Sequence, residues 1–195
     1  MEPEGLTGIV AETERLRLRE WREEDGERFY TIMNTPAVMR HLGGVQDRAK
    51  WGAALNRFEN CRRDHGHTFW LMERKADGEL LGFCGLKRVN SPGTDLIGQF
   101  EIAWRLRESA WGQGYAKEAA IASLDLAFNR FNAPHVVAMT VPLNVGSQGL
   151  MKRLGMSRRA DLDFHDPRFD PDTNPWIVWS IEASDWPAAR AAALA

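Results

Sequence analysis

The stretch from Trp104 to Ala120, which reads WRLRESAWGQGYAKEAA, places two glycines between the end of a strand and the start of a helix. A helix N-terminus exposes backbone N–H groups without intrahelical partners and carries the positive end of the helix dipole. Glycine at Gly112 and Gly114 lets successive amides point into one concavity. The sequence therefore predicts a cradle for a phosphate or pyrophosphate group at this turn.

Other phosphate-binding motifs do not fit this turn. A nucleoside-triphosphate P-loop needs Gly-Lys-Ser or Gly-Lys-Thr, which is absent here, and Lys117 stands where a dinucleotide fingerprint has its third glycine. The alternative is a plain glycine turn between strand and helix. The turn taken alone favours that alternative, because glycine pairs are common in loops.

Hydrophobic periodicity predicts the order of elements around the turn. Leucine alternates with arginine from Arg15 to Glu20, which is the pattern of a half-buried strand. Helical spacing follows over 23–34, about 36–42 and 47–63, and Asp47 is a suitable N-cap for the third of these helices. The later elements are strands over 68–73, 80–89 and 97–106, a helix over about 115–131, a strand over 135–141, a helix over 145–154, a strand over 176–181 and a helical tail.

This order predicts one mixed α/β (α+β) domain over residues 1–195. The early strands form an antiparallel meander, and Ala76-Asp77-Gly78 supplies hairpin turn chemistry within it. The late strand-helix-strand unit adds a crossover. We therefore expect a mostly antiparallel central sheet with helices on both faces.

Charge and hydropathy restrict the partners and the compartment. The 195 residues carry a net charge of -2, which offers no basic footprint for nucleic acid or an anionic membrane. The most apolar helical stretch, AAIASLDLAF, is short and contains Asp125, and the acidic N-terminal sequence lacks the basic and apolar regions of a secretion signal. We therefore expect a cytoplasmic protein without a nucleic-acid or membrane partner.

The cysteines and histidines show no metal or redox pattern. Cys84 falls in a strand and Cys61 on the apolar side of a helix, and buried thiols are usually inert packing. His65 and His67 lie two residues apart ahead of a strand, which is more typical of a turn than of a metal site. We therefore expect no metal cofactor and no cysteine nucleophile.

A second stretch, VPLNVGSQGLMKRLGM at Val141 to Met156, follows the glycine turn. WGQGYAKEA followed by N-x-x-S…L-M-K-R-L-G-M resembles the GNAT N-acetyltransferases, most closely the RimJ/RimL-like (ribosomal-protein-alanine N-acetyltransferase-like) subgroup. The RLRLREW opening, the FWLMER…GELLGFCGL hairpin and the IGQFEIAWRL strand extend the resemblance over roughly residues 12–185. The resemblance implies a GNAT-type domain that transfers acetyl from acetyl-CoA directly to a primary amine in a ternary complex.

The resemblance also implies a set of cofactor-binding residues. The family motif Gln/Arg-x-x-Gly-x-Gly/Ala falls on residues 111–116, where Trp111 replaces Gln or Arg and removes one side-chain donor, as in the RimJ/RimL-like subgroup. The amides of 113–116 would hold the pyrophosphate, and the backbone of 104–106 and Asn144 would bind the pantetheine arm. Helix capping is an alternative, compatible role for Asn144. The implied residues are Trp104, Arg105, Leu106, Trp111, Gly112, Gln113, Gly114, Tyr115, Ala116, Asn144 and Ser147.

Glu101, in the strand sequence QFEIAW, is the candidate catalytic base. Acetyl transfer needs a neutral amine, and neutralising a lysine-like amine at pH 7 costs roughly 4–5 kcal/mol, against about 1.4 kcal/mol for an α-amine. A carboxylate on an apolar strand is costly unless it faces a pocket or has a partner. In the resembled subgroup, a glutamate here is implied in deprotonation, often through water. An outward-facing glutamate in an ion pair is the alternative.

Ser147 is the candidate acid for the departing thiolate. Many GNAT enzymes have a tyrosine in the N-x-x-S…Y-x-K-x-G-F pattern, but Met151 stands at that position and cannot donate a proton. Ser147 is the nearest alternative donor, directly or through water. A serine in the first helical turn that bonds only to backbone is the competing interpretation.

The acceptor is expected between the early helices, about 29–42, and the late loop over 161–174. It would be a peptide N-terminus or a small-molecule amine. The loop carries five aspartates, which could attract a cationic amine. Solvated aspartates that form turns are the alternative, which the loop composition favours slightly. His165 and Phe169 are expected to shape this region.

Two further expectations concern assembly and activity. Exposed tryptophans between Trp176 and Trp186 are candidates for a homodimer edge, since RimL-like proteins are often dimeric. A non-catalytic acyl-CoA-binding or sensing domain of the same fold is the competing hypothesis on function. Met151 and Trp111 favour it mildly, whereas Glu101 speaks against it.

Overall fold

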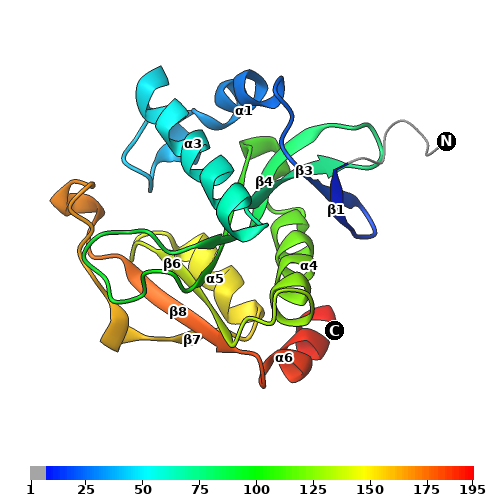
Figure 1. Cartoon of the computed structure of the whole chain (residues 1–195), viewed down its shortest axis with the longest axis vertical. Coiled ribbons are helices and arrows are strands. Elements are labelled where there is room, and N and C mark those ends of the chain that lie inside the picture. The colour runs from blue at the N-terminus through cyan, green and yellow to red at the C-terminus, as the bar shows by residue number, and fades with distance from the viewer. Residues whose placement is uncertain (1–7) are drawn as a thin grey trace.

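The structure is a computed structural model that describes residues 8–195, the side chain of Asp172 excepted. Its helices and strands follow the predicted order closely (Figure 1). In chain order they are β1 (Ile9–Glu12), β2 (Leu16–Arg19), α1 (Asp25–Met33), α2 (Pro36–Met39), α3 (Arg48–His65), β3 (Phe69–Arg74), β4 (Leu80–Arg88), β5 (Phe100–Leu106), α4 (Tyr115–Asn129), β6 (His135–Thr140), α5 (Val145–Arg153), β7 (Ser157–Arg158), β8 (Ile177–Glu182) and α6 (Trp186–Leu194).

The strands form one sheet in the order β1-β2-β3-β4-β5-β6-β8-β7. Every neighbouring pair is antiparallel except β5 and β6, which are parallel and are connected through α4. A parallel pair needs such a crossover, because a tight turn can join only antiparallel strands. The predicted fold class, a mostly antiparallel sheet with one late crossover, is therefore confirmed.

Helices cover both faces of the sheet. Strand β3 is buried on both sides, so that Trp70 and Met72 pack toward α4 while Phe69 and Leu71 pack toward α1 and α3. This follows from the alternation of side chains along a strand. Figure 1 shows α1 and α3 on one side of β3 and β4, with α4 on the other.

Local sequence signals set several element ends. Asp47 accepts a hydrogen bond from the backbone N–H of Lys50 at 2.8 Å, so the predicted N-cap of α3 is confirmed. Gly155 has a φ of +77° directly after α5 and closes that helix as predicted. Within residues 8–195, no helix has the length and apolarity needed to cross a membrane.

The structure differs from the prediction at three strands. Strand β5 begins at Phe100 rather than residue 97, because Gly98 adopts a φ of +82° in a turn closed by Gln99 N–H and the Leu96 carbonyl. Strands β1 and β7 were not predicted. They are edge strands: β7 has only two residues, and the four residues of β1, IVAE, do not alternate apolar and polar side chains.

Candidate functional site

Strands β5 and β6 are neighbours that pair at a single position. Only Glu101 and Val137 are register partners within residues 8–195, whereas β5 pairs with β4 along its whole length and β6 does so with β8. The two strands therefore separate after Glu101, and the β6-facing backbone of β5 is available to another partner. Backbone donors and acceptors away from water need such a partner. A cleft of about 1520 Å³ opens along this edge.

The glycine turn lies at one end of this cleft with the predicted geometry. Gly112 and Gly114 have φ values of +72° and +81°, which only glycine adopts without strain, and Gly114 is the N-cap of α4. No side chain caps this helix. The side-chain amide of Gln113 points away from this turn, because its Nε2 donates to the Ser109 carbonyl at 2.6 Å. The first amides of α4 are thus free to bind an anion, which fits a pyrophosphate group.

Arg15 braces the turn from the far end of the sequence. Its Nη1 donates to the Gln113 carbonyl at 2.9 Å, and its Nε donates to Glu118 Oε2 at 2.7 Å. The guanidinium also lies over the Tyr115 ring, 4.4 Å from its centroid. Sequence reasoning missed this residue, because no local spacing connects Arg15 with Glu118.

Three residues line the cleft near the glycine turn, namely Trp104, Leu106 and Trp111. Trp111 is 47% exposed and lines the cleft, while its indole N–H donates to the Leu106 carbonyl at 2.8 Å. This bond connects Trp111, at the start of the glycine turn, to the end of β5 five residues earlier. The tryptophan that replaces the usual Gln or Arg therefore stabilises the turn rather than donating into the cleft.

Helix α5 presents Asn144 and Ser147 to the same cleft. Asn144 Oδ1 accepts from the backbone N–H of Ser147 at 3.2 Å, so the helix-capping role is confirmed. Ser147 Oγ accepts from Trp104 Nε1 at 3.3 Å. Because an indole N–H can only donate, the serine keeps its own O–H for another acceptor. Met151, one turn later, is buried and supplies an apolar wall.

Glu101 faces the cleft and is also ion-paired. Its side chain is buried, and its carboxylate contacts the ammonium of Lys87, its register partner on β4. Glu101 therefore has a charged partner, as the alternative interpretation expected, but it lines the cleft instead of facing outward. Each charge compensates for the desolvation of the other.

Of the five aspartates in the late loop, three are paired with nearby arginines. Asp161 pairs with Arg159 at 2.7 Å, Asp163 pairs with Arg158, and Asp166 pairs with Arg168 at 2.5 Å. Arg158 and Arg159 directly precede the loop and Arg168 belongs to it, so these three aspartates have local partners, whereas Asp170 lines the cleft without an ion pair among the described residues. The turn-forming interpretation is closer to the structure, since Asp166 also accepts from the Arg168 backbone N–H.

The structure also shows where the tryptophans and cysteines singled out in the sequence lie. The expectation of exposed tryptophans over 176–186 is wrong, because Trp179 and Trp186 are buried and Trp176 is partly buried. Cys84 is fully buried, and desolvation raises the pKa of its thiol to about 12. Among residues 8–195, no group of three or more His, Cys, Asp or Glu side chains could hold a metal ion.

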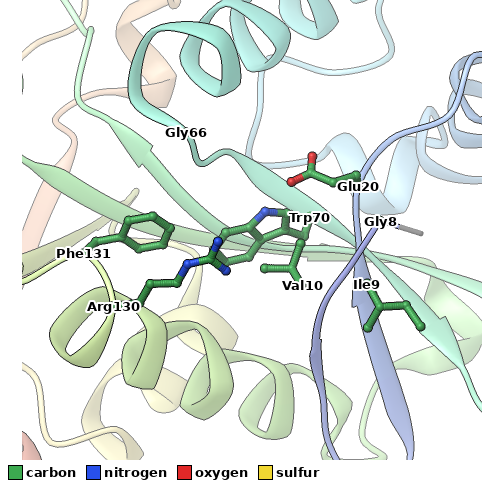
Figure 2. A pocket seen from close by; sticks show the side chains of 8 residues that line it. All are labelled: Gly8, Ile9, Val10, Glu20, Gly66, Trp70, Arg130 and Phe131. Atoms are coloured by element: carbon green, nitrogen blue, oxygen red, sulfur yellow. The ribbon is translucent and has the colours of Figure 1, made fainter. Parts of the chain in front are cut away.

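A smaller cavity of about 180 Å³ lies away from the cleft and shares no lining residue with it. In Figure 2, Glu20 and Arg130 approach the indole of Trp70 from opposite sides. Trp70 Nε1 and Glu20 Oε2 are buried, and neither has a hydrogen-bond partner among the described residues. Burial raises the pKa of the Glu20 carboxyl above its usual range, and nearby arginines partly oppose the shift.

Comparison with known proteins places this site in a family. The family model described as "Acetyltransferase (GNAT) domain" matches residues 15–157, which include the glycine turn and both α4 and α5. YkkB of Bacillus subtilis (strain 168), named an uncharacterized protein, is 30% identical over 145 residues, covering 74% of this chain and 83% of the relative. The uncharacterized N-acetyltransferase YnaD of the same organism is 29% identical over 178 residues, covering 89% and 97%.

Solved structures agree with the assignment. The acetyltransferase from Agrobacterium tumefaciens str. C58 superposes with a TM-score of 0.73 at 27% identity, covering 88% of this chain and 93% of that one. GNAT acetyltransferases use acetyl-CoA and act on an amine acceptor. The cleft, the glycine turn and these matches together show that this chain belongs to the GNAT acetyltransferase family and is an acyltransferase.

Proposed function

We propose that the chain is an N-acetyltransferase of the RimJ/RimL-like type, which transfers acetyl from acetyl-CoA to a primary amine in a ternary complex. One observation carries the proposal: the amide cradle before α4, the open edge of β5 and the Glu101 carboxylate all line a single cleft. A phosphate-containing donor and an amine acceptor thus have adjoining places in it.

The donor would lie along the β5 edge. The amides of residues 113–116 would bind the pyrophosphate, and the backbone of 104–106 would pair with the pantetheine arm. Asn144 Nδ2 is available for the same arm, because the cap uses only Oδ1. These roles are supported by the positive φ of both glycines and by the missing β6 partner beyond Glu101.

The transfer itself needs few groups. The neutral amine attacks the thioester carbonyl, the C–N bond forms, the C–S bond breaks, and the thiolate leaves. Glu101 would take the proton from the ammonium, directly or through water, and Ser147 would give its proton to the thiolate. The Trp104–Ser147 hydrogen bond supports the second role, because it orients the hydroxyl with its proton free.

Thiol release from acetyl-CoA tests the proposal against N-terminal peptides, free amino acids, polyamines and aminoglycosides. Release with any acceptor class supports an enzyme. Met151 favours a second candidate, a non-catalytic acyl-CoA-binding domain, because an apolar side chain occupies the usual acid position. Micromolar acetyl-CoA binding without any release would support that candidate. Absence of binding would refute the cradle.

A cytoplasmic location and a homodimer stay predictions. Size-exclusion chromatography with light scattering measures the oligomeric state.

A further inference from the structure

The cleft carries more positive charge than its own acids neutralise. Eight lysines and arginines line it, against three acidic residues. Glu101 is paired with Lys87, and Asp166 is paired with Arg168, which leaves only Asp170 without an ion pair among the described residues. The basic residues of the cleft are Arg40, Lys50, Arg57, Lys87, Arg105, Lys117, Arg153 and Arg168.

This excess extends beyond the part of the cleft expected to bind phosphate. Lys117 belongs to the first turn of α4 and Arg153 to the last turn of α5, so both adjoin the donor half. The other six basic residues come from α2, α3, β4, β5 and the loops beside them. Arg40 and Arg168 lie in the two segments between which the acceptor is expected, and the side chains of Lys50, Arg57 and Arg105 have no carboxylate partner among the described residues.

Arg105 is the most unusual of these groups. It lies on the same face of β5 as Glu101, four residues or about 13 Å along the strand. Its Nη1 is 3.6 Å from Met39 Sδ, its guanidinium is 5.4 Å from the Phe83 ring centroid, and its Nε is buried without a hydrogen-bond partner. Desolvation lowers the pKa of Arg105 to about 10, with no carboxylate to offset it.

Arg57 is a second guanidinium without a counter-charge. It projects from α3 into the cleft and has no ion pair among the described residues. Desolvation lowers its pKa, and repulsion from Arg168 lowers it further. Arg57 is exposed and Arg105 is partly buried, and guanidinium groups bind carboxylates and phosphates through paired hydrogen bonds.

We propose that the acceptor is a small amine that also carries a carboxylate or a phosphate, and that Arg105 binds this anionic group. The inference rests on the proposed acetyl transfer in the same cleft. Polyamines and aminoglycosides are then poor acceptors, because they are positively charged and the positive charge of the cleft repels them.

Matched acceptor pairs test the proposal by thiol release. The pairs are O-phosphoethanolamine with ethanolamine, glycylglycine with glycylglycinamide, and glutamate with glutamine. We expect kcat/KM to be at least tenfold higher for the more anionic member. Arg105→Gln should remove most of this preference and Arg105→Lys should retain part of it, whereas Arg63→Gln, an exposed arginine on the same helix as Arg57, should leave it unchanged.

Each failure has a different meaning. Faster turnover of the neutral members, of spermidine or of kanamycin would overturn the anionic acceptor and leave the N-acetyltransferase standing. If acidic peptides are acetylated and none of the small pairs is, the acceptor is a peptide and not a small molecule. Bound acetyl-CoA without thiol release from any acceptor would count against the proposed function itself.

A binding measurement decides the inference without turnover. With coenzyme A at saturation, so that the cradle is filled, inorganic phosphate and glutarate are titrated into wild type and Arg105→Gln by calorimetry. We expect wild type to bind at least one of them and the variant to bind at least tenfold more weakly. The variant should keep or raise the wild-type Tm, since it removes a desolvated charge. Equal binding, or a large loss of Tm, would assign Arg105 a structural role instead.

Discussion

Glu101 and Lys87 face each other across the β4–β5 ladder, with the carboxylate of one against the ammonium of the other. Both side chains are largely buried, with 10% and 15% exposure. Together they place a compensated carboxylate on the cleft side of the sheet. In the proposed role, Glu101 would accept a proton from a bound ammonium, and Lys87 compensates for the cost of burying the carboxylate.

Replacing Glu101 by Gln should lower kcat by about 10²–10³, because the general base is lost while the shape of the cleft stays the same. The KM for acetyl-CoA should change little, since the donor half is untouched. Steady-state kinetics against both substrates measures this split. Unchanged turnover in Glu101→Gln would exclude Glu101 as the base.

The same variant should also be less stable, because the Lys87 ammonium keeps its burial and loses its partner. Breaking a buried pair costs roughly 3 kcal/mol. The double variant Glu101→Gln with Lys87→Met should recover most of this free energy of unfolding without recovering kcat. Denaturant unfolding of the wild type, Glu101→Gln, Lys87→Met and the double variant forms a double-mutant cycle. Additive losses in that cycle would contradict a direct coupling between the two charges.

The sequence predicted those parts of the fold that local signals encode. The periods of two and of about 3.6 marked most strands and helices, and Asp47 and Gly155 marked ends that the structure confirms. The contiguous glycine turn was predictable for the same reason, because all of its parts lie within a few residues of Gly112. The edge strands β1 and β7 carry no alternating pattern by which they could be recognised.

The side-chain partners at the site were not predictable, because they depend on register and on distant segments. Lys87 meets Glu101 through strand pairing, and Arg15 meets the glycine turn across about a hundred residues. The aspartates of the late loop suggested an acidic rim because sequence does not show which arginines neutralise them. The net charge of the whole chain, -2, likewise does not show that lysines and arginines outnumber acidic residues inside the cleft.

Gly112→Ala should weaken acetyl-CoA binding by at least tenfold. Gly112 has a φ of +72° and open space where the Cβ of an alanine would lie, so the substitution brings backbone strain without a clash, and the amides of the cradle turn away to relieve it. Gly78→Ala is a matched control, because Gly78 has a φ of +69° with equally open space in a hairpin turn that does not line the cleft.

Both glycine variants should lose about 1 kcal/mol of stability, or a Tm shift of about 2–4 °C. Only Gly112→Ala should raise the Kd for acetyl-CoA, measured by calorimetry. If the two substitutions weaken acetyl-CoA binding equally, the effect of Gly112→Ala comes from the loss of fold stability and not from the geometry of the cradle.

Ser147→Ala should reduce kcat by less than about tenfold, a smaller effect than that of Glu101→Gln. A coenzyme A thiol is a good leaving group, so protonation of the thiolate assists the step without deciding it. Ser147→Thr keeps the hydroxyl and should retain most of the activity. A hundredfold loss in Ser147→Ala with full activity in Ser147→Thr would instead make the proton donor essential. The Trp104 indole loses its acceptor in Ser147→Ala, so unfolding is measured alongside.

Glu20→Gln should stabilise the protein at pH 7, and the gain should shrink as the pH falls. Burial raises the pKa of Glu20, so the folded protein binds this proton more tightly than the unfolded chain does. The stabilisation from the bound proton is complete below the unfolded value of about 4.5 and is lost as the pH rises through the folded value. Glutamine cannot ionise and avoids that loss. Thermal unfolding from pH 7 to pH 4.5 measures the difference, with the exposed Glu23→Gln as control. A difference between Glu20→Gln and wild type that does not change with pH would show that the substitution acts through packing against Trp70 rather than through the charge.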